Sequence, residues 1–189
     1  MADAFAHVRI ILGFVVSLGL ARLLTGLARF IQHPGLKRDP LHLLWAGGML
    51  LLLVHFWWWE FWLGGVKVWT FSIYIFLIAF VFQLYLLTTL LFPDNIAEYE
   101  NYADYFMSRR KWFYGLLAGV NVFDAIDTLI KGPEHTSQYE LDYWLQAPVY
   151  CVLCGVAMFT TNRKFHYGFA ALNLAYQIYY AVHAFTVLG

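Results

Sequence analysis

Charged residues are scarce in this chain: Asp, Glu, Lys and Arg make up 13% of its 189 residues. A soluble domain averages about 25% charged residues, so the composition argues against a water-soluble protein. The 12 basic and 12 acidic residues give no net charge, so no overall positive field indicates a nucleic-acid partner. Only 2 cysteines are present, which excludes a secreted fold held together by several disulfides.

Hydrophobic residues are correspondingly abundant, at 61% of the chain, and aromatic residues reach 20%. A helix needs about 20 mostly apolar residues to cross the hydrocarbon of a bilayer. Six stretches meet this requirement, at about 6–30, 41–63, 67–92, 112–130, 143–161 and 165–188. The sequence therefore predicts an all-α polytopic membrane protein, in which residues 1–189 form a single bundle of six transmembrane helices.

Basic residues are unevenly distributed among the predicted loops. The connections after the first, third and fifth spans contain Lys37 and Arg38, then Arg109, Arg110 and Lys111, then Arg163 and Lys164. Positively charged loops favour the cytoplasmic side, so we expect these three loops inside and both termini outside. Trp57, Trp58, Trp59 and Trp62 then fall at the outer interface, where tryptophan commonly anchors a helix. The expected location is a bacterial inner (plasma) membrane.

The connection between the third and fourth spans has a pattern of its own. Asp94 follows Pro93 as a candidate helix cap, and apolar residues then recur at helical spacing with acids on the other face. The pattern predicts a short amphipathic helix at about 94–108, lying at the inner interface. Its acidic face offers a surface for a protein partner.

The span at 112–130 contains the clearest intramembrane acids. Asn121, Asp124 and Thr128 fall within about 60° of one another around the helix, and Asp127 lies about 60° further round. An ionised residue at the bilayer centre costs roughly 2.5–3.5 kcal/mol, so such residues usually face a cavity or a partner. We interpret Asp124 and Asp127 as groups that bind or relay a cation. The alternative is structural, with Asp127 at the outer interface and Asp124 as a hydrogen-bond acceptor.

The Asn121-x-x-Asp124-x-x-Asp127 spacing resembles the acidic clusters of membrane prenyl- and alcohol-phosphotransferases. That resemblance would imply a Mg²⁺ ion held between carboxylates. Those enzymes have denser motifs, more acids and longer chains than this protein. The identity of any metal is therefore left open, and no enzymatic activity is predicted.

Polar residues also line the last span and the outer half of the second. Asn173, Tyr176, Gln177, Tyr180 and His183 occupy an arc of about 120°, which indicates either a polar-lined path or hydrogen bonds between helices. His55 and Glu60 point about 140° apart on an ideal helix and are not expected to share a face. A hydrated vestibule open to the outside is predicted from the charged and ionisable residues of the outer half, which are Arg9, His55, Glu60, Asp124, Asp127 and His183. Alternatively, Glu60 extends to the interface and pairs with Lys67.

Two redox alternatives follow from other residues. Cys151-Val-Leu-Cys154 resembles the membrane-embedded CxxC of vitamin K epoxide reductases and related disulfide-generating proteins. The resemblance covers four residues, and the second cysteine pair of those proteins is missing. His55 and His183 lie at similar predicted depth, where they could ligate a b-type haem. Cysteine is also a common apolar filler and buried histidine is common, so no cofactor is predicted.

The function that we expect is a small channel or transporter for an ion, a proton or a small polar solute. Asp124 and Asp127, with Asn121 beside them, bind the cation, Glu60 and His55 line the entry, and Asn173 and Gln177 continue the path inward. A seam of small residues on the first span, Gly13, Ser17, Ala21 and Thr25, offers a surface for a homo-oligomer within the lipid bilayer. The alternative is a non-catalytic membrane scaffold or sensor subunit.

Overall fold

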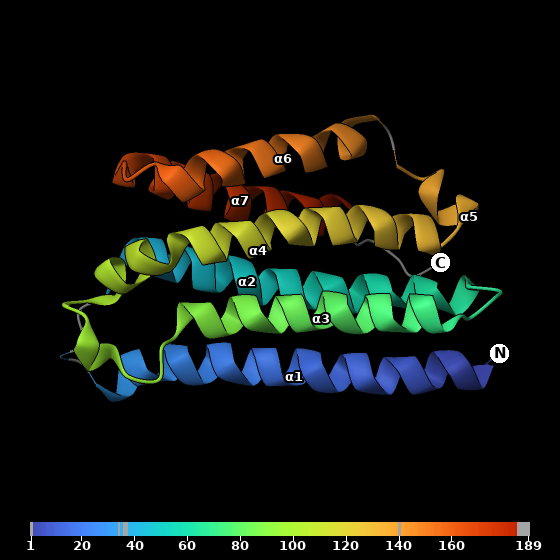
Figure 1. The fold of residues 1–189 in the computed structure, drawn as a ribbon, viewed down its shortest axis with the longest axis horizontal. Coiled ribbons are helices and arrows are strands. Elements are labelled where there is room, and N and C mark those ends of the chain that lie inside the picture. Colours follow the sequence, from blue (N-terminus) through green and yellow to red (C-terminus); the bar gives the residue numbers. More distant parts are fainter. Residues whose placement is uncertain (1, 34, 36–37, 140, 185–189) are drawn as a thin grey trace.

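The computed structural model describes residues 2–33, 35, 38–139 and 141–184, which contain helices and no strand. The elements are α1 (Ala2–Gln32), α2 (Pro40–Trp59), the 3-10 helix η1 (Glu60–Gly65), α3 (Phe71–Leu91), the 3-10 turn η2 (Ile96–Glu98), α4 (Tyr102–Ile130), α5 (Pro133–Thr136), α6 (Leu141–Phe159) and α7 (Arg163–Ala184). The long helices run alternately in opposite directions (Figure 1). The N-terminus, η1 and α5 lie at one end of the bundle, here called the α5 end. The α1–α2, α3–α4 and α6–α7 connections lie at the other, here called the η2 end.

Four helical segments are long and apolar enough to cross a membrane, which supports the predicted class of helical membrane protein. They are Phe5–Gln32, Pro40–Gly65, Phe71–Leu91 and Tyr102–Ile130. Helix α6 contributes a shorter apolar segment, Tyr143–Phe159. Helix α7 is not among the four, because it begins with Arg163 and Lys164 and carries several polar side chains along its length.

The predicted interfacial helix at 94–108 is wrong. The side chain of Asn95 accepts a hydrogen bond from the backbone N–H of Ala97 and caps only the short turn η2. The side chain of Asn101 then accepts from Asp104 N–H at 3.0 Å, and α4 begins at Tyr102. Because each asparagine cap starts a new element, the segment is divided there. Residues 102–108 are thus the first turns of the long helix α4.

The boundaries of other predicted spans also shift. Helix α2 loses its α-helical geometry at Trp59 and continues to Gly65 as η1. Helix α3 begins at Phe71, four residues later than predicted, because the Thr70 hydroxyl caps it by accepting from Ile73 N–H at 3.3 Å. The last span is described only as far as Ala184, so residues 185–188 lie outside the described part of the chain.

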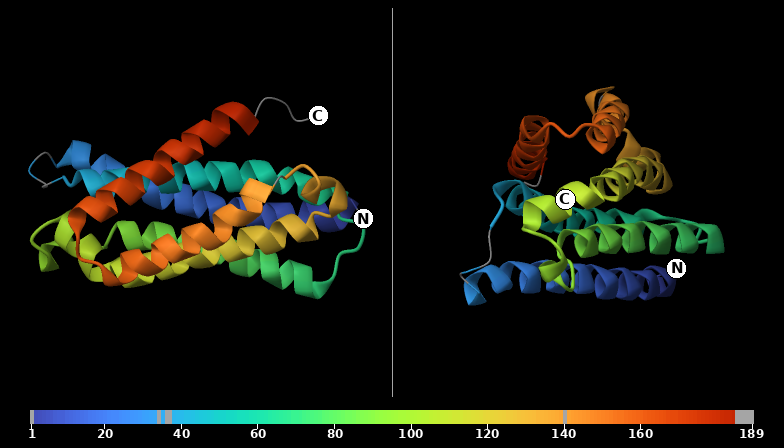
Figure 2. Two further views of the ribbon diagram at one scale, coloured as in Figure 1. Left: turned by 90° about the horizontal axis from the view of Figure 1, so that it is seen from above. Right: turned by 60° about the vertical axis from the view of Figure 1, so that its left-hand side comes forward.

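Helices α6 and α7 are attached to different parts of the bundle. Helix α6 packs mainly on α4 and α7 mainly on α2, whereas α6 and α7 have few contacts with each other. Figure 2 shows α7 running obliquely across the other helices. Four helices, α2, α4, α6 and α7, therefore surround a space that direct packing of α6 on α7 does not fill.

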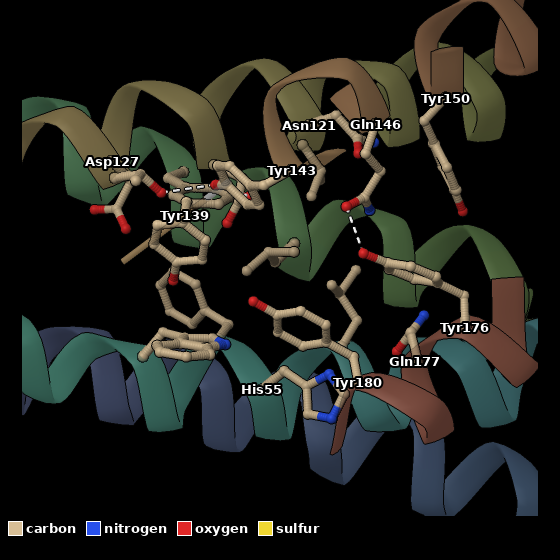
Figure 3. A pocket seen from close by; sticks show the side chains of 18 of the residues that line it. His55, Asn121, Asp127, Tyr139, Tyr143, Gln146, Tyr150, Tyr176, Gln177 and Tyr180 are labelled. Carbon is tan, nitrogen blue, oxygen red and sulfur yellow. Dashed lines mark hydrogen bonds between the residues drawn. The ribbon is translucent and has the colours of Figure 1, made fainter. Parts of the chain in front are cut away.

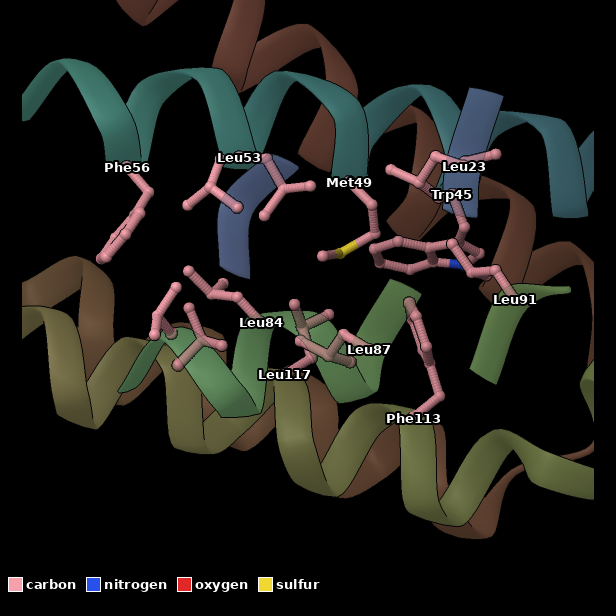
Figure 4. Packing of buried hydrophobic residues seen from close by; sticks show 14 of the residues in the cluster. Leu23, Trp45, Met49, Leu53, Phe56, Leu84, Leu87, Leu91, Phe113 and Leu117 are labelled. Carbon is pink, nitrogen blue, oxygen red and sulfur yellow. The ribbon is translucent and has the colours of Figure 1, made fainter. Parts of the chain in front are cut away.

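Large side chains fill the bundle between the α5 end and the η2 end. Trp45, Met49 and Leu53 of α2 face Leu84 and Leu87 of α3, with Phe113 and Leu117 of α4 beside them (Figure 4). Trp45, Leu84 and Leu87 are fully buried. Lipid tails are as apolar as leucine, so van der Waals contact holds helices together within a membrane. This close packing closes the interior toward the η2 end.

Candidate functional site

A cavity of about 140 Å³ lies in the α5 half of the bundle, between α2, α4, α6 and α7, and Phe80 and Leu84 of α3 also line it. Seven residues that the sequence marked as a candidate path line it: His55, Glu60, Asn121, Asp124, Asp127, Asn173 and Gln177. They come from α2, the start of η1 directly after it, α4 and α7, so the three groups of residues are far apart in the sequence. The bundle thus brings into one site residues that the sequence could only place at similar depth.

A buried lysine joins two of the cavity carboxylates. The ammonium group of Lys131, at the end of α4, lies 3.2 Å from Oε1 of Glu60 and also pairs with Asp127, one turn earlier on the same helix. The side chains of all three residues are at most 4% exposed. Burial disfavours the charge on Lys131, but the two carboxylates outweigh burial and raise the pKa of Lys131. The two carboxylates therefore favour the charged form of Lys131.

The structure corrects two expectations about Glu60. Its partner is Lys131, whereas Lys67 is exposed. Glu60 and His55 also line the same cavity, although they point apart on an ideal α-helix. Glu60 is the first residue of η1, directly after the end of α2 at Trp59. Glu60 is 4% exposed and so is not an interfacial carboxylate.

Several buried polar atoms in the cavity wall have no hydrogen-bond partner among the described residues. They are Oε2 of Glu60, Oδ1 of Asp127, Nδ1 of His135 and Oε1 of Gln177. Each belongs to a side chain whose residue is no more than 8% exposed. A buried polar atom without a partner costs roughly 1–3 kcal/mol, and such atoms in native structures commonly mark a functional site. Four of them line one cavity, which makes this cavity the candidate site.

Asp124 has a different environment from Asp127. It is exposed, and its Oδ2 accepts a hydrogen bond from the Tyr143 hydroxyl of α6 at 2.8 Å. The same hydroxyl lies 2.7 Å from Oγ1 of Thr128. A phenol has one proton, so Thr128 donates to Tyr143 while Tyr143 donates to Asp124. The hydrogen bond from Tyr143 of α6 therefore holds the side chain of Asp124, on α4, at the cavity wall.

Five aromatic rings form a continuous arc along the cavity wall, here called the aromatic arc. In order they are Tyr143, Tyr139, Trp59, Tyr180 and Tyr176, all of which line the cavity. The successive ring centroids are separated by 4.2, 6.3, 6.2 and 6.0 Å. The rings come from α6, the segment before it, α2 and α7, so the arc spans the gap between α6 and α7 (Figure 3).

Hydrogen bonds connect α6 and α7 across the cavity. The Tyr176 hydroxyl of α7 donates to Oε1 of Gln146 at 2.6 Å, as Figure 3 shows. The Tyr150 hydroxyl of α6 donates to Oδ1 of Asn173, which also accepts from Gln177. Pro148 lies inside α6 between the two bridging residues. Proline removes one backbone hydrogen bond from a helix, so α6 has a point of flexure between its two links to α7.

Two other predicted site residues lie apart from the cavity or outside the described side chains. Arg9 does not line the cavity: its guanidinium stacks 4.7 Å from the Phe61 ring and 5.7 Å from the Trp57 ring. The first turns of α1 run beside η1, so Arg9 faces the outer side of that segment. The side chain of His183 is outside the described residues.

The residues of the two redox hypotheses lie on α2, α6 and α7, and both hypotheses stay predictions. Cys151 and Cys154 are free thiols of α6, and neither lines the cavity. Cys151 donates to the carbonyl oxygen of Ala118 at 3.6 Å, and Cys154 is fully buried. His55 lies in the cavity wall, and the side chain of His183 is outside the described residues. Among the residues described, no three His, Cys, Asp or Glu side chains are arranged to hold a metal ion.

Sequence reasoning missed several residues of the cavity. Lys131 lies just beyond the span predicted at 112–130 and was not included in the candidate path, although its position four residues after Asp127 is the spacing of an intrahelical ion pair. His135 and Tyr139 lie in or just after α5, a helical turn too short to show periodicity. Tyr143 and Gln146 belong to a span whose polar residues gave no obvious stripe.

No known protein family, curated protein or solved structure matches this chain. The geometry of the cavity is therefore the basis for a functional proposal.

Proposed function

We propose that this protein is a small transporter of the bacterial inner membrane, with the cavity as the binding site for a cation or another small polar solute. The proposal includes six membrane spans. At about 1.5 Å per residue, α6 and α7 are roughly 28 and 33 Å long, close to the thickness of the hydrocarbon core. The distribution of basic residues favours an orientation with the α5 end, and so the cavity, toward the outside.

The observation that carries this proposal is the charge of the cavity wall. Glu60, Asp124 and Asp127 line it, and Lys131 is the only ammonium among the described lining residues. Membrane-embedded ionisable residues are costly and commonly mark ion or substrate pathways. An excess of carboxylates in a cavity favours a ligand that is positively charged or brings a proton.

The closed core favours a carrier over an open channel. Trp45 and Phe113 pack at 5.0 Å between ring centroids, in the buried layer between the cavity and the η2 end. A solute must then be released by a rearrangement of helices. Pro148 and the small contact between α6 and α7 supply an element that can move. This mode of transport is part of the proposal.

Assembly of several copies is also proposed. Three residues of the small-residue seam are exposed on α1: Ser17, Ala21 and Thr25. Their small side chains allow a second helix to approach α1 closely. Light scattering in mild detergent measures the mass. A particle larger than one 22.0 kDa chain after subtraction of the detergent supports assembly, and a monomer contradicts it.

The test of transport is flux into liposomes that contain the purified protein. Asp124→Asn removes one cavity charge while leaving the side-chain size almost unchanged, and its uptake of the transported cation or proton is expected to fall about tenfold or more. Asp104→Asn is the matched control, because Asp104 is an exposed acid in the first turn of the same helix. Equal flux in the two variants contradicts the proposal.

A sensor or scaffold subunit is the second candidate, favoured by the packed core below the cavity. Such a protein binds its ligand without moving it across the membrane. Ligand binding that Asp124→Asn weakens, with no flux in the unmodified protein, would support this second function. The acidic residues around η2, Glu98 and Glu100, are exposed at the η2 end and offer a surface for its partner.

A further inference from the structure

We propose that the cavity binds a small organic cation, an alkylammonium ion, held by the carboxylates and the aromatic arc. This inference rests on the proposed role of the cavity as the binding site and names the chemical class of its ligand. It is independent of whether the ligand is then transported.

The first argument is the balance of charge. Three carboxylates, those of Glu60, Asp124 and Asp127, face one ammonium group, that of Lys131. His135 does not correct this imbalance at neutral pH, because burial and the nearby Lys131 lower the pKa of its imidazole to about 4. An uncompensated buried charge is strongly unfavourable, so a buried carboxyl group either takes up a proton or pairs with a cation, and a bound cation stabilises the ionised site.

The second argument is the direction of the unpartnered oxygen atoms. Lys131 uses Oε1 of Glu60 and Oδ2 of Asp127, which leaves Oε2 and Oδ1 of the same carboxylates without a partner among the described residues. Both residues are at most 4% exposed, and both line the cavity. These oxygens can accept hydrogen bonds from an ammonium N–H or lie against its positive charge.

The third argument is the aromatic part of the cavity wall. The aromatic arc presents five rings in succession, and Trp59, the type of ring that binds cations best, is its central member. A cation within about 6 Å of a ring centroid is attracted to the face of the ring. A hydrated metal ion or a proton gains little from such a surface, whereas alkyl groups around a nitrogen atom gain both dispersion and electrostatic contact.

The size of the cavity sets the size of the ligand. A cavity on the order of 150 Å³ holds a molecule such as benzene, with about six heavy atoms. The volume here, about 140 Å³, is similar. The ligand class is therefore limited to small ammonium ions, such as choline or tetramethylammonium, that carry no long chain.

Calorimetric titration of the purified full-length protein in detergent provides the test. The two probes are choline and 3,3-dimethyl-1-butanol, which have the same shape and differ in whether nitrogen or carbon is the central atom. We expect choline to bind and the uncharged alcohol to bind at least about tenfold more weakly. Equal affinity for the two probes, or binding of neither, would overturn the inference.

Two variants locate the binding site. Trp59→Leu removes the central ring of the arc, and choline affinity is expected to fall on the order of tenfold. Trp112→Leu is the matched control, because Trp112 is 70% exposed and does not line the cavity. Tyr180→Leu is a second arc variant, measured in case Trp59→Leu does not fold. Unchanged choline affinity in a folded arc variant contradicts the inference.

Flux measurements separate this inference from the proposed function. Choline binding that depends on the arc, in a protein without flux, supports the ligand class and contradicts transport. Flux of protons or Na⁺ with no effect of choline supports transport and contradicts the ligand class. Choline uptake that Asp124→Asn abolishes supports both.

Discussion

The ammonium group of Lys131 lies 3.2 Å from a carboxylate oxygen of Glu60, although the two residues are 71 positions apart in the chain. This contact joins the end of α4 to the beginning of η1 at the α5 end of the bundle. It also affects the charge of the cavity, because Lys131 pairs with Asp127 as well and compensates part of the negative charge of the two carboxylates. The stability of the protein and the properties of its candidate site therefore depend on the same three side chains.

Replacing Lys131 tests this dependence. Lys131→Met leaves Glu60 and Asp127 buried without their counter-ion, and the free energy of unfolding is expected to fall by about 3–5 kcal/mol. Denaturation in mixed micelles measures the change. Lys67→Met, at an exposed lysine near the same end, is expected to change the stability by less than about 0.5 kcal/mol. If the two substitutions cost the same, the buried ion pairs do not stabilise the fold.

The stability should also depend on pH through His135. Burial and the nearby Lys131 lower the pKa of its imidazole from 6.5 to about 4. The ring packs against Trp59 and Trp62, and its Nε2 lies 3.4 Å from the Tyr139 hydroxyl. Between pH 6.5 and 4 the unfolded chain therefore binds a proton that the folded protein does not. Stability is expected to decrease as the pH falls through this range.

Thermal unfolding between pH 7.5 and 4.5 measures this contribution. The decrease in melting temperature is expected to be smaller in His135→Asn than in the unmodified protein, when each is compared with its own value at pH 7.5. His33→Asn, which alters an exposed histidine at the η2 end, serves as the control and should follow the unmodified protein. An identical pH profile for all three proteins argues against a buried neutral imidazole.

Gly132 is the backbone position on which this arrangement depends. It has φ 97° and ψ 173°, a conformation that is almost exclusive to glycine, between Lys131 and the first residue of α5. Gly132→Ala is expected to destabilise the protein by about 1–3 kcal/mol through backbone strain, because no side chain lies near its added methyl group. Gly155→Ala, in α6 where space is also open, should have a neutral or slightly stabilising effect. Equal stability of the two variants would contradict the strained conformation.

The hydrogen bond between Tyr176 and Gln146 is expected to hold α6 and α7 together over the cavity. Tyr176→Phe keeps the ring in the aromatic arc and removes the 2.6 Å bond, which contributes about 1 kcal/mol. Dissociation of a bound ligand should become roughly fivefold faster, as measured by stopped-flow tryptophan fluorescence. Tyr85→Phe, on α3 and outside the cavity wall, is the control. A dissociation rate that is the same in both variants contradicts a closing role for this bond.

The candidate site was only partly visible in the sequence, and the reason differs from residue to residue. Asp124 and Asp127 were identified because an acid within an apolar helix is conspicuous in any context. Glu60 was identified, but its partner was not, because an ion pair between distant elements leaves no local pattern. The prediction of a helix at 94–108 was wrong because the side chains of Asn95 and Asn101 each cap a separate element within that segment.

By itself the sequence determined the kind of protein and the position of most of its helices. Long apolar runs have no stable form in water, and backbone groups in lipid must be paired within a helix, so composition alone settles this level of structure. Only the tertiary structure decided which polar side chains meet. The packing of η1 against the end of α4 places Lys131 between two carboxylates, and it depends on segments that are far apart in the chain.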